Sequence, residues 1–349
     1  MAWTGLLLAA ALATATADAA PEAPDHRQQL ARQYWTGLAD RIVRDGTPRD
    51  RALLSQFPYH GADGLTGSAR EGRQLRIAAE RAPTDELVQW LWASASPAAS
   101  GCSASDPCPD RAMASARLTP DNARAWLPVL EAAQAAGDRE ATSAVLGRMA
   151  SASHFSEPFA PVVDAWRDLL RRAPLPEAAL FDEAGQPEHG PEARRYRDAV
   201  AGVAAAAAMA MPIQGLYRHC DVKATPAPSA TDIGRCRQVA RLMLRAPTLI
   251  QRSLGEALMR RAGGEPVDWK RQQLWWLSAQ FALDRDHGEA MRYFDDLHDT
   301  QSEIRAIELA LQRAGKPLTP PAEWVYVSPF APSADAGAAT TEPARPATP

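Results

Sequence analysis

The chain has 349 residues, of which 46% are hydrophobic and 7% aromatic, and its formal net charge is −4 at pH 7. This length is enough to bury a sizeable core, and the near-balanced charge argues against a nucleic-acid-binding protein. Alanine is abundant, strand-forming residues are sparse, and Leu, Arg, Glu and Gln recur at three- and four-residue spacings. The composition therefore predicts an all-α fold with no significant β-sheet.

Residues 1–19 have the pattern of a signal peptide. An apolar segment from Leu6 to Ala13 precedes a small-x-small site at Ala17 to Ala19, after which we expect cleavage. The apolar segment is shorter than the roughly 20 residues that span a bilayer. Because the segment before it lacks Lys and Arg, the alternative is a buried N-terminal helix. We expect a periplasmic or secreted protein, exported by a Gram-negative bacterium, with no stable membrane insertion after cleavage.

The four cysteines are expected to form disulfides, because disulfides persist in the oxidising compartments that exported proteins reach. Three pairings are possible. Sequence proximity favours Cys102 with Cys108 and Cys220 with Cys236. The competing interpretation is a four-cysteine zinc site with His219 nearby, but neither spacing matches the short pairs that structural zinc uses. We expect no metal ion and no cofactor.

The N-terminal half shows helical patterns over residues 27–44, 48–56 and 68–82. From Pro83 onward a weak period follows, because a proline precedes a tryptophan by six to eight residues three times. The tryptophans are spaced 36 and 40 residues apart, which is close to the length of a two-helix repeat. They are Trp90, Trp126 and Trp166.

Residues 119–149 are the best-defined unit of this series. Thr119 is expected to cap a first helix with Pro120 at its first position, and Gly137-Asp138 is expected to form the turn before a second helix. Neither helix can bury its apolar stripe alone, so neighbouring units must stack on it. The predicted core positions are Trp126, Val129, Leu130 and Ala133 in the first helix and Ala141, Val145, Leu146 and Met149 in the second.

This unit resembles the tetratricopeptide repeat over about 34 residues, through the segment PDNARAW, the small Ala132 and Ala133, and the Gly-Asp turn. Pro128 departs from the family pattern, and we expect a kink there or a helix that starts late. The resemblance implies a superhelix of stacked antiparallel helical hairpins, whose concave face binds peptides or proteins. It does not imply catalysis.

The sequence divides into five parts. After the signal peptide, an N-terminal helical-repeat part (20–172) is followed by a linker (173–193) rich in Pro, Gly and Glu, a C-terminal helical part (194–330) and a disordered tail (331–349) rich in Pro, Ala and Thr. Expected helices in the C-terminal part span residues 192–211, 231–245, 248–262, 268–283, 287–297 and 300–314. The segment Trp324-Val325-Tyr326 is expected to fold back over an exposed apolar end.

Known catalytic motifs are absent from the sequence, which contains no nucleophile elbow, zinc helix, Walker loop or dinucleotide fingerprint. Acidic residues gather over residues 284–303, where solvated helix faces are favoured over a metal or acid-base site. Trp275 and Trp276 form the candidate binding surface. One ring is expected in the core and the other at its edge, where an exposed ring would bind a peptide or glycan; packing between helices is the favoured role.

These features predict a non-catalytic periplasmic helical-repeat scaffold or binding module for a protein or peptide partner in the cell envelope. The alternative is an all-α envelope hydrolase that acts on cell-wall glycan or peptide through carboxylates that no motif marks. A purely structural role in the envelope is a third hypothesis.

Overall fold

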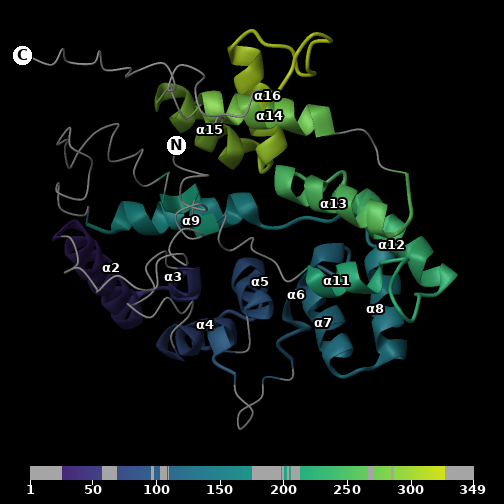
Figure 1. Ribbon diagram of the computed structural model, residues 1–349. Coiled ribbons are helices and arrows are strands. Elements are labelled where there is room, and N and C mark those ends of the chain that lie inside the picture. Colours follow the sequence, from purple (N-terminus) through teal and green to yellow (C-terminus); the bar gives the residue numbers. More distant parts are fainter. Residues whose placement is uncertain are drawn as a thin grey trace, which may run out of the picture.

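The computed structural model is helical throughout the part of the chain that it describes (Figure 1). Within that part no strand forms, and the only β interaction is an isolated parallel bridge between Asn122 and His154. The predicted all-α fold is therefore confirmed. The predicted signal peptide, the tail and nearly all of the linker lie outside the described residues, which are 26–56, 69–95, 98–102, 108, 110–174, 198, 200–202, 204–205, 213–265, 270–283 and 287–326.

The N-terminal helices begin where the sequence supplies capping residues. Thr47 and Asp50 form a reciprocal capping box with Pro48 in the first turn, and Asp85 accepts hydrogen bonds from the backbone of the following helix. The helices are α2 (His26–Asp45), α3 (Pro48–Leu53), α4 (Ala69–Arg81) and α5 (Glu86–Ser94), with 3₁₀ turns η1 (Leu54–Gln56) and η2 (Ala98–Ser100).

The middle of the chain corrects the predicted start of the 119–149 unit. Thr119 is not an N-cap: it follows α6 (Ala114–Leu118), and its hydroxyl donates to the carbonyl of Ser115. A 3₁₀ turn, η3 (Ala123–Trp126), comes next, and α7 (Leu127–Ala135) starts late with Pro128 in its first turn, as expected. The predicted Gly-Asp turn is confirmed by α8 (Arg139–Ser151), which Asp138 caps. Helix α9 (Phe159–Arg172) follows.

The helix at residues 214–219 was not predicted, and most of the predicted helix 192–211 lies outside the described residues. The other five predicted C-terminal helices are confirmed within a few residues, because local signals set most of their ends. Gly263 and Gly315 adopt the left-handed conformation (φ 61° and 64°) directly after two of them. Gly255 permits a close helix approach, since a Cβ there would lie 2.9 Å from the backbone nitrogen of Leu244. These helices are α11 (Gln214–His219), α12 (Ala230–Met243), α13 (Leu249–Arg261), α14 (Lys270–Leu283), α15 (His287–Thr300) and α16 (Glu303–Arg313).

The described residues form two hydrophobic cores. The first core contains buried side chains of α2 to α5, α9 and α14 to α16, and α9 crosses the molecule between α3 and α15 (Figure 1). The second core combines residues 123–155 with residues 213–262, and therefore α7, α8, α11, α12 and most of α13. Each core takes helices from both sides of the predicted linker, so the division of the sequence at 173–193 does not coincide with the division between the cores.

The predicted repeat series is not confirmed. Trp90 and Trp166 are buried in the first core, whereas Trp126 lies partly exposed at the edge of the second core, where its Nε1–H donates to the carbonyl of Pro120. The three tryptophans thus occupy unlike positions. Of the predicted core positions in 119–149, Val129, Ala133 and Ala141 are also only partly buried, while Leu130, Val145, Leu146 and Met149 are buried. The tetratricopeptide resemblance stays a prediction.

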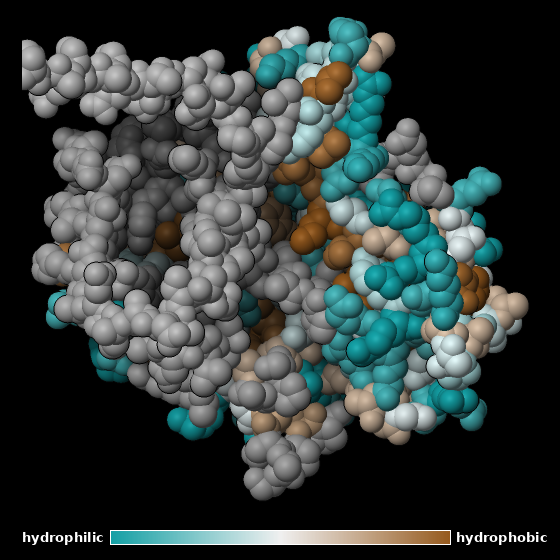
Figure 2. All heavy atoms as spheres, viewed as in Figure 1, coloured by the Kyte–Doolittle hydropathy of each residue, from teal (hydrophilic) through white to brown (hydrophobic). Residues whose placement is uncertain are grey.

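Large apolar side chains are rarely exposed on the described surface. Figure 2 shows mostly hydrophilic residues on the side of the molecule where α11 to α13 lie. Among the described residues, the exposed large hydrophobic side chains are Val222, Ile250 and Val325. Because they are far apart in the sequence and none is part of a buried cluster, they do not mark an apolar docking surface. Among the described helices, none is long and apolar enough to cross a membrane.

Candidate functional site

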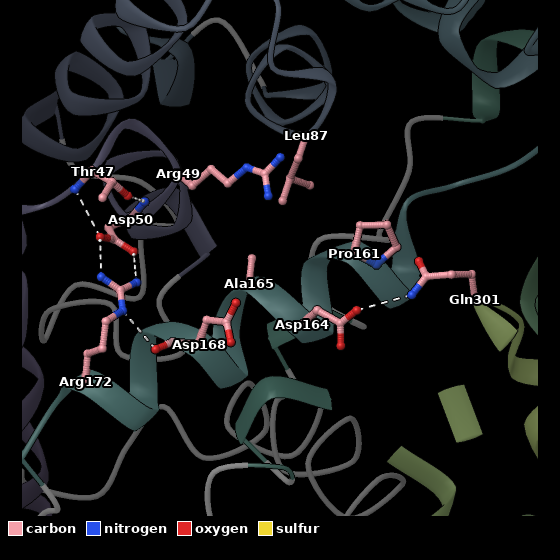
Figure 3. Close-up of a pocket in the computed structure, with 10 residues that line it drawn as sticks. All are labelled: Thr47, Arg49, Asp50, Leu87, Pro161, Asp164, Ala165, Asp168, Arg172 and Gln301. Atoms are coloured by element: carbon pink, nitrogen blue, oxygen red, sulfur yellow. Dashed lines mark hydrogen bonds and ion pairs between the residues drawn. The ribbon is translucent and has the colours of Figure 1, made fainter. Parts of the chain in front are cut away.

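A cavity of about 260 Å³ lies along one face of α9, where that helix meets α3 and the start of α5 (Figure 3). The α9 residues that line it occupy positions i, i+3, i+4, i+7 and i+11 from Pro161, so they share a helix face, while Trp166 and its neighbours on the opposite face fill the first core. The lining residues are Thr47, Arg49, Asp50, Leu87, Pro161, Asp164, Ala165, Asp168, Arg172 and Gln301.

One end of the cavity is closed by a bidentate ion pair between α3 and α9. The two terminal nitrogens of Arg172 donate to the two carboxylate oxygens of Asp50 at 2.7 and 3.1 Å. Asp50 also accepts from the backbone N–H of Thr47 at 3.0 Å. Burial by itself would raise the pKa of Asp50, but the hydrogen bonds from Arg172 and Thr47 outweigh burial and hold the pKa below its usual value. Asp50 is therefore an ionised structural anchor.

The other two carboxylates of the cavity, Asp164 and Asp168, accept fewer hydrogen bonds than Asp50 does. Asp164 accepts hydrogen bonds from the Gln301 amide at 3.2 Å and lies 2.9 Å from Nδ1 of His298. Asp168 pairs with Arg171 at 2.6 Å, but the two side chains are 61% and 62% exposed, so this pair is well screened by water. Both carboxylates can accept further hydrogen bonds from a bound cationic group.

The cations of the site are already paired. Arg172 is held by Asp50, and Arg49 donates through its Nε to Asp85 at 2.6 Å. The cavity therefore presents more available negative than positive charge. Its volume of about 260 Å³ is below the range of roughly 300 to 1,000 Å³ for pockets that bind whole small-molecule ligands. A single basic side chain beside the apolar Leu87, Pro161 and Ala165 suits both the size and the charge.

The structure buries both members of the predicted binding surface. Trp275 and Trp276 are 8% and 6% exposed, so the expectation that one ring lies at the edge of the core is wrong. Trp276 packs under the guanidinium of Arg252, which lies 5.5 Å from the ring centre. Trp275 is covered by Trp324, whose ring meets it edge-on with the centroids 5.2 Å apart. The predicted folding back of Trp324 is thereby confirmed.

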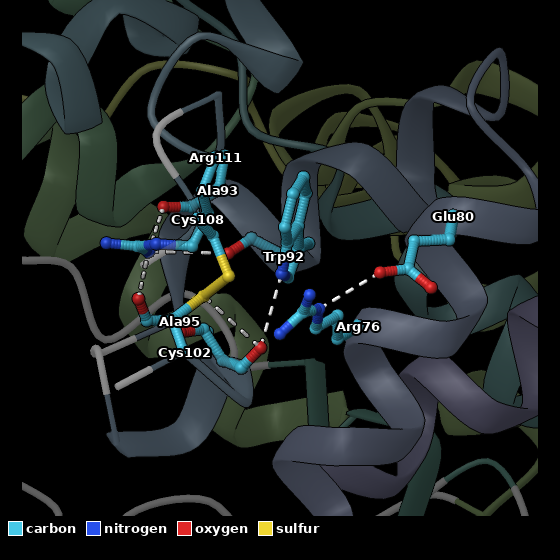
Figure 4. Close-up of a disulfide and its surroundings, with 9 residues drawn as sticks. Arg76, Glu80, Trp92, Ala93, Ala95, Cys102, Cys108 and Arg111 are labelled. Atoms are coloured by element: carbon cyan, nitrogen blue, oxygen red, sulfur yellow. Dashed lines mark hydrogen bonds and ion pairs between the residues drawn. A yellow bond between two sulfur atoms is a disulfide. The ribbon is translucent and has the colours of Figure 1, made fainter. Parts of the chain in front are cut away.

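Both predicted disulfides are present, Cys102 with Cys108 and Cys220 with Cys236. All four cysteines are consumed, so the alternative zinc site is wrong. Cys220 and Cys236 are fully buried in the second core. The first disulfide lies beside Arg111, which donates to the carbonyls of Ala93 and Ala95 at the C-terminal end of α5 (Figure 4). Disulfides are typical of proteins outside the cytosol.

The described part of the acidic segment 284–303 is engaged in structural contacts. Asp295 pairs with Arg167 of α9, and Asp296 pairs with Arg313. Glu303 accepts from the first backbone N–H of α13 at 2.7 Å. No group of three or more potential metal ligands occurs among the described residues. Residues 284–286, which start the segment, lie outside them.

The cavity itself was not predicted from the sequence. Asp164 and Asp168 alternate with Arg167, Arg171 and Arg172, which is the ordinary pattern of a solvated helix face. The observation that distinguishes this face is its contact with α3, and the partners Asp50 and Arg172 are 122 residues apart in sequence. The one local sequence feature that pointed to the cavity is the four-residue spacing of Asp164 and Asp168, which places both carboxylates on the same helix face as Pro161 and Ala165.

Comparisons of the chain with protein-family models, with curated protein sequences and with solved structures found no match, so the proposals below depend on the sequence and the structure.

Proposed function

We propose that the chain is a non-catalytic binding module in the cell envelope, exported to the periplasm of a Gram-negative bacterium, that presents its helical surface to a protein or peptide partner. The cavity beside α9 takes a lysine or arginine side chain of that partner. The observation that carries the proposal is the placement of Asp164 and Asp168 at a cavity of side-chain size, whose lining contains three carboxylates and two arginines that are both already bound by carboxylates. Complementary charges across an interface supply specificity and speed of association.

The hydrolase alternative receives less support from the same geometry. Glycan hydrolysis generally needs two carboxyl groups on opposite sides of the scissile bond, one of them protonated. Asp164 and Asp168 lie on the same face of one helix. Asp50, on the opposite wall, has both oxygens bound by Arg172 and a lowered pKa, so it is a poor general acid.

Photo-cross-linking in living cells tests the proposal. A photoreactive residue placed at position 171, on the rim beside Asp168, should cross-link a defined partner protein. Replacing both carboxylates (Asp164→Asn with Asp168→Asn) should reduce that adduct by about tenfold, because two charge contacts to the partner are lost. The matched control is Asp121→Asn with Glu140→Gln, two exposed acids beside the second core.

An adduct that survives the asparagine pair, or that the control pair weakens equally, would contradict a role for the cavity. If instead the purified chain cleaved peptidoglycan or its stem peptides, and the asparagine pair abolished the cleavage, the hydrolase would replace the binding module.

A further inference from the structure

The segment after α16, residues 317–326, lies across α14 and is here called the strap; it is at the yellow end of the coloured chain in Figure 1. It contains no helix and no strand, and it includes Pro317, Pro320 and Pro321. Gly315, in the left-handed conformation, ends α16 and directs the chain toward α14. The strap is thus an irregular, proline-rich segment held against one helix, as a bound peptide would be.

Three side chains of α14 hold the strap, and all three donate to backbone carbonyls. Trp275 donates through Nε1–H to the carbonyl of Pro317 at 3.0 Å, and Gln272 donates to the carbonyl of Leu318 at 2.8 Å. Arg271 donates through one terminal nitrogen to the carbonyls of residues 321, 322 and 324. Every sequence has backbone carbonyls. These contacts therefore depend on the backbone conformation of the segment more than on its side chains.

Two side chains of the strap, Leu318 and Trp324, pack against the first core. The Trp324 ring packs edge-on against Trp275 with the centroids 5.2 Å apart. The neighbouring Val325 is 76% exposed, and Thr319, Ala322 and Glu323 are also exposed. The face of α14 that carries Arg271, Gln272 and Trp275 is here called the α14 groove. It binds a run of carbonyls in a proline-restrained backbone and the ring of Trp324.

This combination is the chemistry by which proline-rich segments are recognised. Such segments have few internal hydrogen bonds, so their carbonyls are free to accept, and proline lowers the entropy lost on binding. The strap conforms, with one internal bond from the N–H of Trp324 to the carbonyl of Pro321. A tryptophan N–H beside an aromatic contact is a suitable donor for such a ligand.

We propose that the α14 groove is a docking site for a proline-rich segment, carrying an aromatic residue, of a partner protein, and that the strap occupies this groove in cis until such a segment displaces it. The groove shares no residue with the cavity beside α9, so this inference does not depend on the function proposed above. The partner must exceed the high local concentration of the tethered strap, which for a short connection is on the order of millimolar. The strap therefore sets a threshold for docking.

A fluorescent peptide with the strap sequence, residues 316–326, is the probe, titrated by anisotropy against the full chain. Trp324→Ala should weaken the strap and increase peptide affinity about tenfold over the wild type, because the cis competitor is lost. Adding Arg271→Ala to Trp324→Ala should abolish the gain, since the carbonyl donor is removed. Val325→Ala, at the exposed neighbouring position, should bind the peptide as weakly as the wild type.

Equal peptide affinity of wild type and Trp324→Ala would overturn the proposal, as would a gain that persists when Arg271 is replaced. Circular dichroism must show that each variant is folded. If Trp324→Ala does not fold, Pro320→Gly with Pro321→Gly takes its place, because glycine raises the entropy of the released strap and weakens it without removing the ring. That variant must then bind the peptide more tightly than the wild type for the proposal to stand.

Discussion

Different interactions stabilise the interior of each core. Buried aromatic rings dominate the first core, which contains Trp35, Trp90, Trp166, Trp275, Trp276, Tyr293 and Phe294. The second core is rich in sulfur, with Met149, Met243 and Met259 around the disulfide of Cys220 and Cys236. Rings pack with specific geometry and large buried area, whereas methionine is adaptable and fills irregular gaps. The first core thus relies on shape and the second on a covalent bond.

A buried polar group marks the seam between the cores. Arg124, Glu157 and Gln251 are 1%, 3% and 0% exposed, and the Nε of Arg124 donates to Glu157 at 3.0 Å. Arg124 also lies over the ring of Trp90, 5.4 Å from its centre. Gln251 also forms a side-chain hydrogen bond with Glu157, while two buried polar atoms here, Trp90 Nε1 and the amide oxygen of Gln251, have no hydrogen-bond partner among the described residues. Such atoms are costly unless ordered water satisfies them.

Trp166→Ala tests whether the first core depends on its aromatic rings more than the second core does, and it should have the largest effect. Trp166 is fully buried and meets Trp35 edge-on with the centroids 6.5 Å apart. Its truncation should lower the free energy of unfolding by about 3 to 5 kcal/mol, the usual cost of a large cavity in a rigid core. Urea unfolding measures the change. The control is Trp126→Ala, at the edge of the second core; an equal loss there would mean that the cores do not differ in their dependence on rings.

Replacing Glu157 tests how much the buried ion pair between Arg124 and Glu157 contributes to stability. Glu157→Leu should cost about 3 kcal/mol, because it removes the ion-pair partner of the buried Arg124. Replacing both residues with leucine should recover most of that loss, since an apolar pair needs no hydrogen-bond partners. Unfolding curves of the two single variants and the double variant give the coupling energy. A double variant as unstable as Glu157→Leu alone would show that the ion pair is not the cause.

Opening the disulfide of the second core should have the next largest effect. Replacing Cys220 and Cys236 with serine should cost about 3 kcal/mol, because the bond restricts the unfolded chain. The matched variant lacks Cys102 and Cys108. These two cysteines are 6 residues apart in sequence, whereas Cys220 and Cys236 are 16 apart, so the first disulfide closes a shorter loop. This variant should lose about 2 kcal/mol on the same entropic argument. The reverse order in thermal melts would contradict the covalent role assigned to the second core.

The smallest effect is expected at the edge of the first core, for Asp50→Asn. Arg172 is 56% exposed, so screening limits the contribution of its pair with Asp50 to the free energy of unfolding to about 1 kcal/mol or less. Because the pKa of Asp50 is lowered in the folded chain, its stabilisation is complete above the unfolded value near 3.8 and is lost as pH falls through the folded value.

The measurement for Asp50→Asn is the midpoint of urea unfolding as a function of pH. The variant should lose stability at neutral pH and become less sensitive to acid than the wild type. Asp168→Asn, which alters an exposed carboxylate on α9, the helix that carries Arg172, should leave stability unchanged. If Asp50→Asn loses stability in acid as steeply as the wild type, the acid response of the wild type is caused by other carboxylates.

Helix positions were predicted well because their signals are local. The turn at Gly137-Asp138 and the stop at Gly263 depend on neighbouring residues alone. The disulfides followed from proximity along the chain. The orientation of Trp126 was missed, because the side of a helix that becomes buried depends on distant partners. Burial of Trp275 depends in part on the strap, which reaches α14 from more than 40 residues away.

Helix α13 belongs to both cores, since Leu249 near its start packs in the first and Leu258 near its end packs in the second. Between them lies Gln251, fully buried at the seam. Melting of either core removes one end of the helix that the other core needs. Heating should therefore give one calorimetric transition with equal van't Hoff and calorimetric enthalpies, although two separate clusters are present.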